Sequence, residues 1–291
     1  MKLVTFTHGG TTRIGAIVAE EVVDVSGHGR DVPHDMLTFL AQGETVLDQA
    51  RAVCASGRGR LALADVRLEA PLQRPPKILA VGLNYRDHIE ETGLPMPVVP
   101  MIFNKQSTAV TSPQGDIYLP RESEQLDYEG EFAVVIGRYC RHVPKNRARE
   151  VIAGYTIVND VSVRDWQRRV PTFTMGKSWD THCPLGPWIT TADEVGDPHA
   201  LELKTWVNGE LRQHSNTSQL LFNAFDLVEH LTTAFTLEPG DIISTGTPGG
   251  VAVAMKPPKW LKPGDVVKIA IDKLGEIENR VIAEPEGTVR I

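Results

Sequence analysis

The sequence predicts a mixed α/β protein in which β-structure predominates, with a small N-terminal α+β domain at residues 1–70 and a larger β-rich domain at residues 71–291. Two observations support this prediction. Short β-branched runs separated by Gly and Pro turns dominate the chain beyond residue 77. The stretch RLEAPLQRPPK at residues 67–77 is rich in proline, which favours an extended connector because proline disfavours helix at the preceding residue.

Within the N-terminal domain, apolar residues recur at strand spacing over residues 3–6 and 15–25 and at helical spacing over residues 35–43 and 44–56. These segments carry no residues with an identifiable chemical role. We therefore look for function in the larger domain.

The larger domain is expected to be a rolled sheet with few helices. Two segments have helical patterns, residues 84–93, which end at Gly93, and residues 218–235. The turn signal LxPGD occurs at residues 237–241 and 261–265, each time before a strand, which favours a rolled sheet in the C-terminal third. The expected strands are residues 77–83, 131–137, 154–160, 186–191, 203–209, 241–245 and 265–271.

Composition excludes several classes of function. The net charge is −7 and there is no dense Lys/Arg run, so we expect no nucleic-acid partner. No segment reaches the roughly 20 apolar residues of a membrane span, and the first residues lack a signal peptide's apolar stretch, so we expect neither membrane insertion nor export. Cys54, Cys140 and Cys183 form no CxxC pair, which fits a reducing compartment, and we expect a cytoplasmic protein.

The segment DYEGEFAVVIG, residues 127–137, concentrates acidic side chains. On a strand, Asp127, Glu129 and Glu131 would point to one face, because side chains alternate between the two faces. The apolar residues that follow indicate a strand buried on both faces. The acids would thus lie at the edge of a core, where unpaired carboxylates are costly.

A divalent cation resolves this conflict, because Mg²⁺ or Mn²⁺ takes oxygen ligands and needs only a few carboxylates. Asp160 ends the apolar strand at residues 154–160 and is the best third ligand beside Glu129 and Glu131. The alternative is an exposed edge strand with solvated acids.

Two further pairs of polar residues have helical spacing. His88 and Glu91 are three residues apart, so the carboxylate can orient the imidazole as a general base, with water as one candidate target. The alternative is a surface histidine beside an acidic helix end. Arg164 and Gln167 are also three apart and could hold a substrate carboxylate, with surface pairing as the alternative.

Lys177 lies in a polar segment with little periodicity, where a lysine could stabilise an enolate or donate to a keto oxygen. The loop STGTPGGV, residues 244–251, lets backbone N–H groups at Gly246 and the hydroxyls of Thr245 and Thr247 approach an anion. It lacks the P-loop motif, and an ordinary turn between strands is the alternative.

Taken together, six motifs resemble the fumarylacetoacetate hydrolase (FAH) family: AVGLNYRDHIEE, PMIFNKQSTAV, DYEGEFAVVIG, GYTIVNDVSVRDWQ, GKSWDTHCPLGPW and ISTGTPGGV. The resemblance covers about residues 70 to 283. It implies an FAH-type β-roll catalytic domain, a homodimer, and a Mg²⁺, Mn²⁺ or, in some members, Ca²⁺ ion on Glu129, Glu131 and Asp160. Asp127 is expected to lie outside the ligand set.

The resemblance also implies roles for other residues. His88 and Glu91 would form a water-activating dyad. Lys105, Arg164, Gln167 and Lys177 would contact the substrate, and the loop at residues 246–251 would line its carboxylate end.

These features together predict a metal-dependent hydrolase that cleaves a C–C bond in a 2,4-dioxo acid of the acylpyruvate or fumarylpyruvate type, with a role in aromatic catabolism. The small-molecule partner would be a 2-oxo acid. The same enolate arises in oxaloacetate decarboxylation and in isomerisation of 2-hydroxyhepta-2,4-diene-1,7-dioate, so these activities stay as alternatives. A non-catalytic protein with a structural Ca²⁺ site is a further alternative, but Lys177, Arg164 and Gln167 argue against it.

Overall fold

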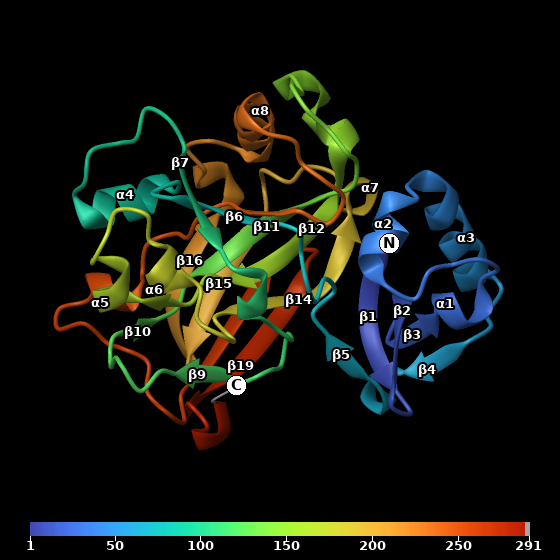
Figure 1. Ribbon diagram of the computed structural model, residues 1–291, viewed down its shortest axis with the longest axis horizontal. Helices are drawn as coiled ribbons and strands as arrows, with labels where there is room; N and C mark the ends of the chain where they lie inside the picture. Colours follow the sequence, from blue (N-terminus) through green and yellow to red (C-terminus); the bar gives the residue numbers. More distant parts are fainter. Residues whose placement is uncertain (289–291) are drawn as a thin grey trace.

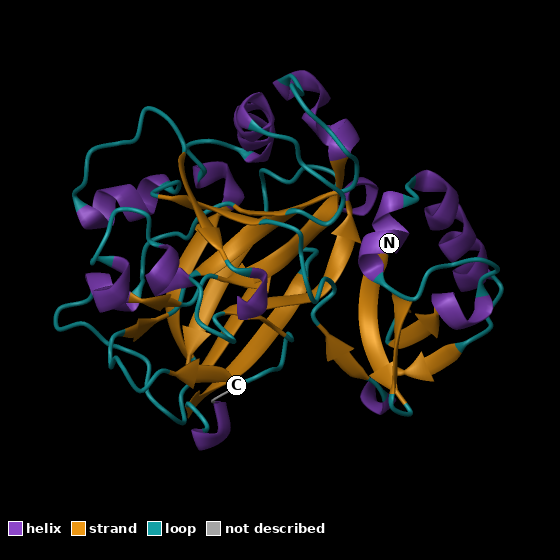
Figure 2. Cartoon of the chain, in the orientation of Figure 1, coloured by secondary structure: helices purple, strands orange, loops and turns teal. Residues whose placement is uncertain are grey.

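The computed structural model describes residues 1–288, in which strands form one large and two smaller sheets (Figures 1 and 2). The large sheet has the order β4 (Arg60–Ala62), β3 (Glu21–Asp24), β2 (Thr11–Val18), β1 (Lys2–His8), β14 (Cys183–Thr191), β12 (Ile152–Asn159), β11 (Gly130–Ile136), β17 (Ile242–Ser244), β6 (Ile78–Gly82) and β7 (Met101–Lys105), with β5 (Arg67–Glu69) on β1 and β8 (Val110–Thr111) on β14. The second sheet has the order β16 (Glu210–Asn216), β15 (Glu202–Val207), β18 (Val266–Ile271), β19 (Gly275–Ala283) and β9 (Ile117–Leu119). The third pairs β10 (Leu126–Asp127) with β13 (Ser162–Val163).

Helices lie around the sheets (Figure 2). The α-helices are α1 (Val25–His28), α2 (Met36–Ala41), α3 (Glu44–Ala55), α4 (Arg86–Thr92), α5 (Arg164–Gln167), α6 (Thr174–Lys177), α7 (Ala192–Val195) and α8 (Ala224–Ala234). Short 3₁₀ turns occur at Leu63–Asp65, Ser107–Ala109, Lys145–Val151, Thr217–Gln219, Ala252–Ala254 and Glu286–Thr288. Within residues 1–288 no helix combines the length and apolarity needed to cross a membrane.

The expected fold class is confirmed, and two segments differ in detail. Residues 15–25 fall in two strands, β2 and β3, because the chain turns at Ala19, which has a positive φ. The helix expected over residues 218–235 begins only at Ala224, where Asn223 forms a capping box with Asp226. The boundary at residue 70 stays a prediction, since β1 bonds both β5 and β14 and one sheet therefore includes strands from both parts.

Strand β11 is buried on both faces, as the sequence predicts. Phe132 and Val134 belong to the large core cluster that also includes Ile269 of the second sheet. Ala133 and Val135 belong to the cluster built on the N-terminal helices. The N-terminal part of the chain, at the right of Figure 1, therefore belongs to the same core as one face of the strand that carries Glu131.

The register of β11 and β12 brings the acidic residues to one end of the sheet. The two strands are antiparallel, with Gly130 opposite Asn159, so the start of β11 meets the end of β12. A Cβ at Gly130 would lie 2.3 Å from the Thr205 hydroxyl, which only glycine avoids. Close approach of the second sheet thus depends on this glycine.

The structure corrects one expectation about this segment. Asp127 does not continue the same strand face as Glu129 and Glu131, because it lies on β10, which pairs with β13. Its carboxylate accepts hydrogen bonds from the backbone N–H groups of Ala252 and Val253. These bonds and the separate pairing interrupt the alternation.

We predict that Phe132→Ala lowers the free energy of unfolding by about 3–5 kcal/mol, because a fully buried aromatic ring that stacks on Tyr155 is removed from the core. Tyr139→Ala is the control, since Tyr139 is 73% exposed and should cost no more than about 0.5 kcal/mol. Denaturant titration of both variants measures the difference. Equal stability of the two would contradict the assignment of β11 to the core.

Candidate functional site

Three carboxylates converge at the end of the large sheet. Ligand oxygens of Glu129, Glu131 and Asp160 all lie within 4.8 Å of one another, and all three residues are buried. The backbone N–H of Asp160 donates to the Glu129 carbonyl at 2.9 Å, which fixes the two chain segments together. In residues 1–288 this is the only such group of three potential metal-ligating side chains.

Three buried cations surround these acids. Lys177 Nζ donates to Glu129 Oε2 at 2.6 Å and to Asp160 Oδ2 at 2.7 Å. Lys105 Nζ donates to Asp160 Oδ1 at 2.7 Å and to the backbone carbonyl of Lys177. Arg164 lies 2.7 Å from Glu129 Oε1 and 2.8 Å from the carboxylate of Asp127. Lys177 and Arg164 therefore each join two carboxylates, whereas Lys105 joins Asp160 to the backbone of Lys177.

Glu131 has no such cationic partner. Its Oε2 accepts hydrogen bonds from the Ser244 hydroxyl at 2.6 Å and from the Gly246 N–H at 2.9 Å. Burial, and then the charges of Asp160 and Glu129, raise the pKa of Glu131 well above its usual value. Burial opposes the charged form of Glu129 as well, but Lys177 and Arg164 outweigh it and lower the pKa of Glu129 to about 2.

These residues fit a divalent cation. Counting Asp127, four buried carboxylates face three buried cations, which leaves one excess negative charge among buried side chains. Only oxygen ligands converge, as Mg²⁺ and Mn²⁺ prefer. Glu131, which has no cationic partner among residues 1–288, is the carboxylate whose charge a bound cation would compensate.

The histidine and glutamate of α4 lie beside this group. His88 Nδ1 is 3.3 Å from Glu91 Oε2, and His88 lines the cavity in front of the acids. The N–H of Gly250 donates to both oxygens of Glu91, at 3.0 and 3.1 Å. Asp87 of the same helix accepts from Gly249 N–H at 3.3 Å and from the Ser215 hydroxyl. Hydrogen bonds thus join the His88–Glu91 dyad directly to the loop at residues 244–251, here called the glycine loop.

The glycine loop is held mainly by its own hydroxyls. Thr245 Oγ1 donates to the Phe132 carbonyl at 2.7 Å, and Thr247 Oγ1 donates to the Gly130 carbonyl at 3.0 Å. Thr247 lines the cavity, whereas Thr245 and Gly246 bond to β11. The expected contacts of Thr245, Gly246 and Thr247 with substrate stay predictions.

A cavity of about 300 Å³ connects these groups to solvent. Glu129, Glu131, Lys177, His88, Arg164 and Gln167 line its polar part. Lys105 is fully enclosed by Asp160, Val161 and the Lys177 backbone, so in this structure it positions the acids and the lysine. The volume is at the lower end of the roughly 300–1,000 Å³ of ligand pockets, which suits a small acid.

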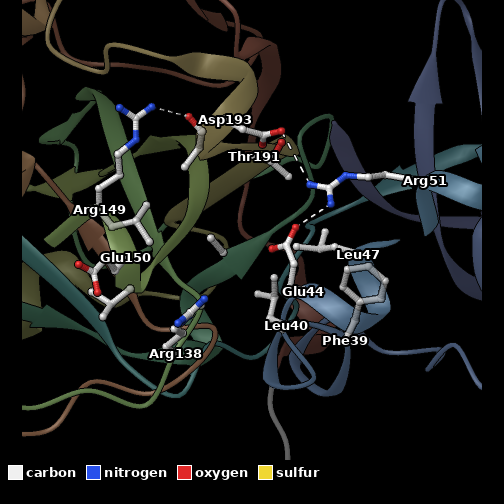
Figure 3. A pocket seen from close by; sticks show the side chains of 16 residues that line it. Phe39, Leu40, Glu44, Leu47, Arg51, Arg138, Arg149, Glu150, Thr191 and Asp193 are labelled. Carbon is white, nitrogen blue, oxygen red and sulfur yellow. Dashed lines mark hydrogen bonds and ion pairs between the residues drawn. The ribbon is translucent and has the colours of Figure 1, made fainter. Parts of the chain in front are cut away.

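A second cavity, of about 250 Å³, lies between the N-terminal helices α2 and α3 and the ends of β12 and β14 (Figure 3). Several of its charged groups pair locally: Arg51 lies between Glu44 and Asp193, and Arg149 donates to the carbonyls of Ala192 and Gly196. The uncompensated acidic group therefore singles out the first cavity as the candidate site.

A family profile described as fumarylacetoacetate (FAA) hydrolase, C-terminal, matches residues 77–282. The chain belongs to the fumarylacetoacetate hydrolase family. The resemblance inferred from the motifs is thereby confirmed, and the chain is an enzyme of this family. A fumarylacetoacetate hydrolase from Exiguobacterium antarcticum shares the fold with a TM-score of 0.86 and 37% identity, covering 98% of this chain and 100% of that one.

Curated relatives carry a specific activity in their names. The mitochondrial oxaloacetate tautomerase FAHD2B of Bos taurus is 44% identical over 263 residues, covering 90% of this chain and 84% of that protein. The mitochondrial oxaloacetate tautomerase of Xenopus laevis is 40% identical over 288 residues, covering 97% of this chain and 90% of that protein. These names favour the oxaloacetate alternative over the expected hydrolase, and they lend no support to a cytoplasmic location.

One structural relative is a complex with a metal ion and a 2-oxo acid. Maleylpyruvate hydrolase from Sphingobium sp. SYK-6, in complex with manganese (II) ion and pyruvate, has a TM-score of 0.82 and 33% identity, covering 98% of this chain and 100% of that one. A role in aromatic catabolism is not tested by these comparisons.

Several residues that build the site were not identified from the sequence. Ser244 holds Glu131, and Gln213 donates to Thr247 Oγ1 at 2.8 Å while accepting from Gly130 N–H at 3.0 Å. Gln213 lies on a different sheet from Gly130, so no local pattern could have indicated the contact. Ser244 could have been noticed as the polar end of an apolar strand facing β11.

We predict that Glu131→Ala abolishes binding of Mg²⁺ and Mn²⁺ while the fold persists, because one of three converging ligands is lost. Titration calorimetry measures binding, and circular dichroism checks the fold. Glu150→Ala is the control, since that glutamate is exposed and lies outside the site. Unchanged metal affinity in Glu131→Ala would exclude this centre.

Proposed function

We propose that this enzyme is a divalent-metal-dependent oxaloacetate tautomerase, which moves a proton between C3 and the C2 oxygen of the substrate. The observation that carries the proposal is that a carboxylate-paired imidazole and a buried ammonium face one small cavity beside a metal-type acidic group. Keto–enol exchange needs a proton acceptor near C3 and a stabiliser of negative charge at the C2 oxygen. The names of the curated relatives support the same activity.

His88 and Lys177 have different roles in this reaction. His88, oriented by Glu91, takes the C3 proton as the C–H electron pair forms the C2=C3 bond and the C2=O π pair moves to the oxygen. The protonated imidazole then delivers this proton to the C2 oxygen, and ketonisation runs the two transfers in reverse. Lys177 remains a cation, because Asp160 and Glu129 overcome the effect of burial and raise its pKa, so it donates to the developing enolate oxygen. A bound Mg²⁺ or Mn²⁺ would act as a Lewis acid that polarises the 2-oxo group.

Hydrolysis of a 2,4-dioxo acid is the second candidate. The His88–Glu91 pair that accepts a carbon-bound proton could equally activate a water molecule, and a structural relative is a maleylpyruvate hydrolase. Decarboxylation of oxaloacetate and isomerisation of a dienedioate would use the same enolate. The substrate assay must therefore separate proton transfer from loss of CO₂ and from C–C hydrolysis.

The test uses the Mg²⁺-loaded protein and freshly dissolved oxaloacetate. Loss of the ultraviolet absorbance of the enol reports tautomerisation, pyruvate release reports decarboxylation, and consumption of acetylpyruvate or maleylpyruvate reports hydrolysis. We expect the fastest turnover in the first assay and its loss on addition of a chelator. Fast hydrolysis with no acceleration of enol loss would replace the proposal by its second candidate.

We predict that His88→Ala lowers kcat for tautomerisation on the order of 10²-fold or more, with the metal still bound, because a positioned general base is lost. Glu91→Gln should also lower the rate, since the imidazole loses its charged partner. Glu90→Gln is the matched control, because Glu90 lies exposed on the same helix. Wild-type rates in both dyad variants would exclude the role proposed for His88.

We also propose that the enzyme is a homodimer and resides in a reducing compartment. Within residues 1–288, seven of the ten large apolar side chains that are exposed lie on two segments near the cavity mouth: Leu94, Met96, Val98, Val99, Met101, Val170 and Met175. Such concentrations of exposed apolar surface mark interaction sites in soluble proteins.

The three free cysteines support a reducing compartment, which the cytosol and the mitochondrial matrix both provide.

We predict that the double substitution Val98→Lys and Val99→Lys converts a dimer of two 32.0 kDa chains into a monomer, because these side chains are 89% and 61% exposed and charge would oppose their burial. Light scattering coupled to gel filtration measures the mass. Tyr139→Lys, on a separate exposed loop, should leave it unchanged. A wild-type monomer at micromolar concentration would refute the homodimer.

A further inference from the structure

The two ends of the active-site cavity differ in charge and exposure. Glu129, Glu131 and Lys177 form its closed end, where all three are buried. Leu94 and Met101, which are 51% and 39% exposed, lie at its open end. A substrate bound by its 2-oxo acid group at the closed end would therefore place its distal end among apolar side chains.

The buried cations cannot serve that distal end. Arg164 donates from Nε to Asp127, from Nη1 to Gln167 at 2.9 Å, and approaches Glu129 through Nη2. Lys177 is held by Glu129 and Asp160 at the closed end. Their positive charge is directed to the acidic group rather than to the mouth.

Arg168 is the remaining cation that lines this cavity. It is exposed and directly follows α5, and its backbone N–H donates to the Arg164 carbonyl at 3.2 Å. Among residues 1–288 no acidic side chain lies within ion-pairing distance of it. Its backbone is thus fixed to the site while its guanidinium has no partner.

The neighbouring arginine has a different environment. The guanidinium of Arg169 lies 3.7 Å from the centre of the Trp166 ring, which is a cation–π contact, and Arg169 does not line the cavity. The two adjacent arginines carry the same formal charge, but only Arg168 lines the cavity.

We infer that Arg168 is a specificity-determining residue that recognises the second carboxylate of dicarboxylic 2-oxo acids. The inference rests on the proposed function and deepens it by naming the residue that would bind the distal carboxylate of oxaloacetate. A guanidinium binds a carboxylate through two parallel hydrogen bonds, and that of Arg168 forms no ion pair with any residue in 1–288. Monocarboxylic 2-oxo acids would leave Arg168 without a partner and bind more weakly.

The test measures dissociation constants by calorimetry on the Mg²⁺-loaded wild type, Arg168→Gln and Arg169→Gln. Three probes are used: oxalate, which occupies only the closed end, 2-oxoglutarate, and 2-oxopentanoate, which has a methyl group in place of the distal carboxylate. We expect Arg168→Gln to raise the dissociation constant of 2-oxoglutarate by about tenfold, which is the usual effect of losing a charge-assisted hydrogen bond. Oxalate and 2-oxopentanoate should bind equally well to all three proteins.

Two results would overturn the inference. In the first, the wild type binds 2-oxoglutarate no more tightly than 2-oxopentanoate. In the second, Arg169→Gln weakens binding of 2-oxoglutarate as much as Arg168→Gln does. The second result would indicate a general charge effect. Failure of the proposed function is distinguishable, since binding could still depend on Arg168 in a protein that does not accelerate loss of the oxaloacetate enol. Kinetics add an independent check, because Arg168→Gln should raise KM for oxaloacetate far more than it lowers kcat.

Discussion

The burial of four carboxylates at the ends of β10, β11 and β12 is the constraint on which the site depends. Isolated charges of this kind could not be retained inside a core, so each must find a cation, a hydrogen-bond donor or a metal. Lys105, Arg164 and Lys177 come from three different segments of the chain and meet only because these acids hold them. Electrostatic compensation thus assembles both the metal-type centre and the substrate cavity.

The same compensation determines which groups remain available for chemistry. Most donors of Lys105 and Arg164 are used within the protein, so these residues fix geometry. Lys177 bonds two carboxylates but also lines the cavity, and an ammonium has a third donor to offer. His88 receives its orientation from Glu91, which the glycine loop in turn holds.

The sequence was informative wherever a local pattern determined the outcome. The period-two alternation from residue 130 onward correctly assigned Phe132 and Ala133 to opposite faces of β11. Helical spacing correctly paired His88 with Glu91. The alternation failed at Asp127, because a separate strand pairing and two backbone donors from residues far along the chain redirect this side chain. Contacts such as Gln213 with Gly130 join separate sheets and have no local signal.

The N-terminal part of the chain holds none of the proposed catalytic side chains, yet it belongs to the same core cluster as one face of β11. Phe39, Leu40 and Val46 share a core cluster with Ala133 and Val135 of β11, the strand that also carries Glu131 near its start. Removing this domain would expose an apolar strand face to water and loosen the support of the acidic group. The two parts are therefore not interchangeable modules, and a shortened catalytic core would have to be redesigned along this face before it could retain a precise active site.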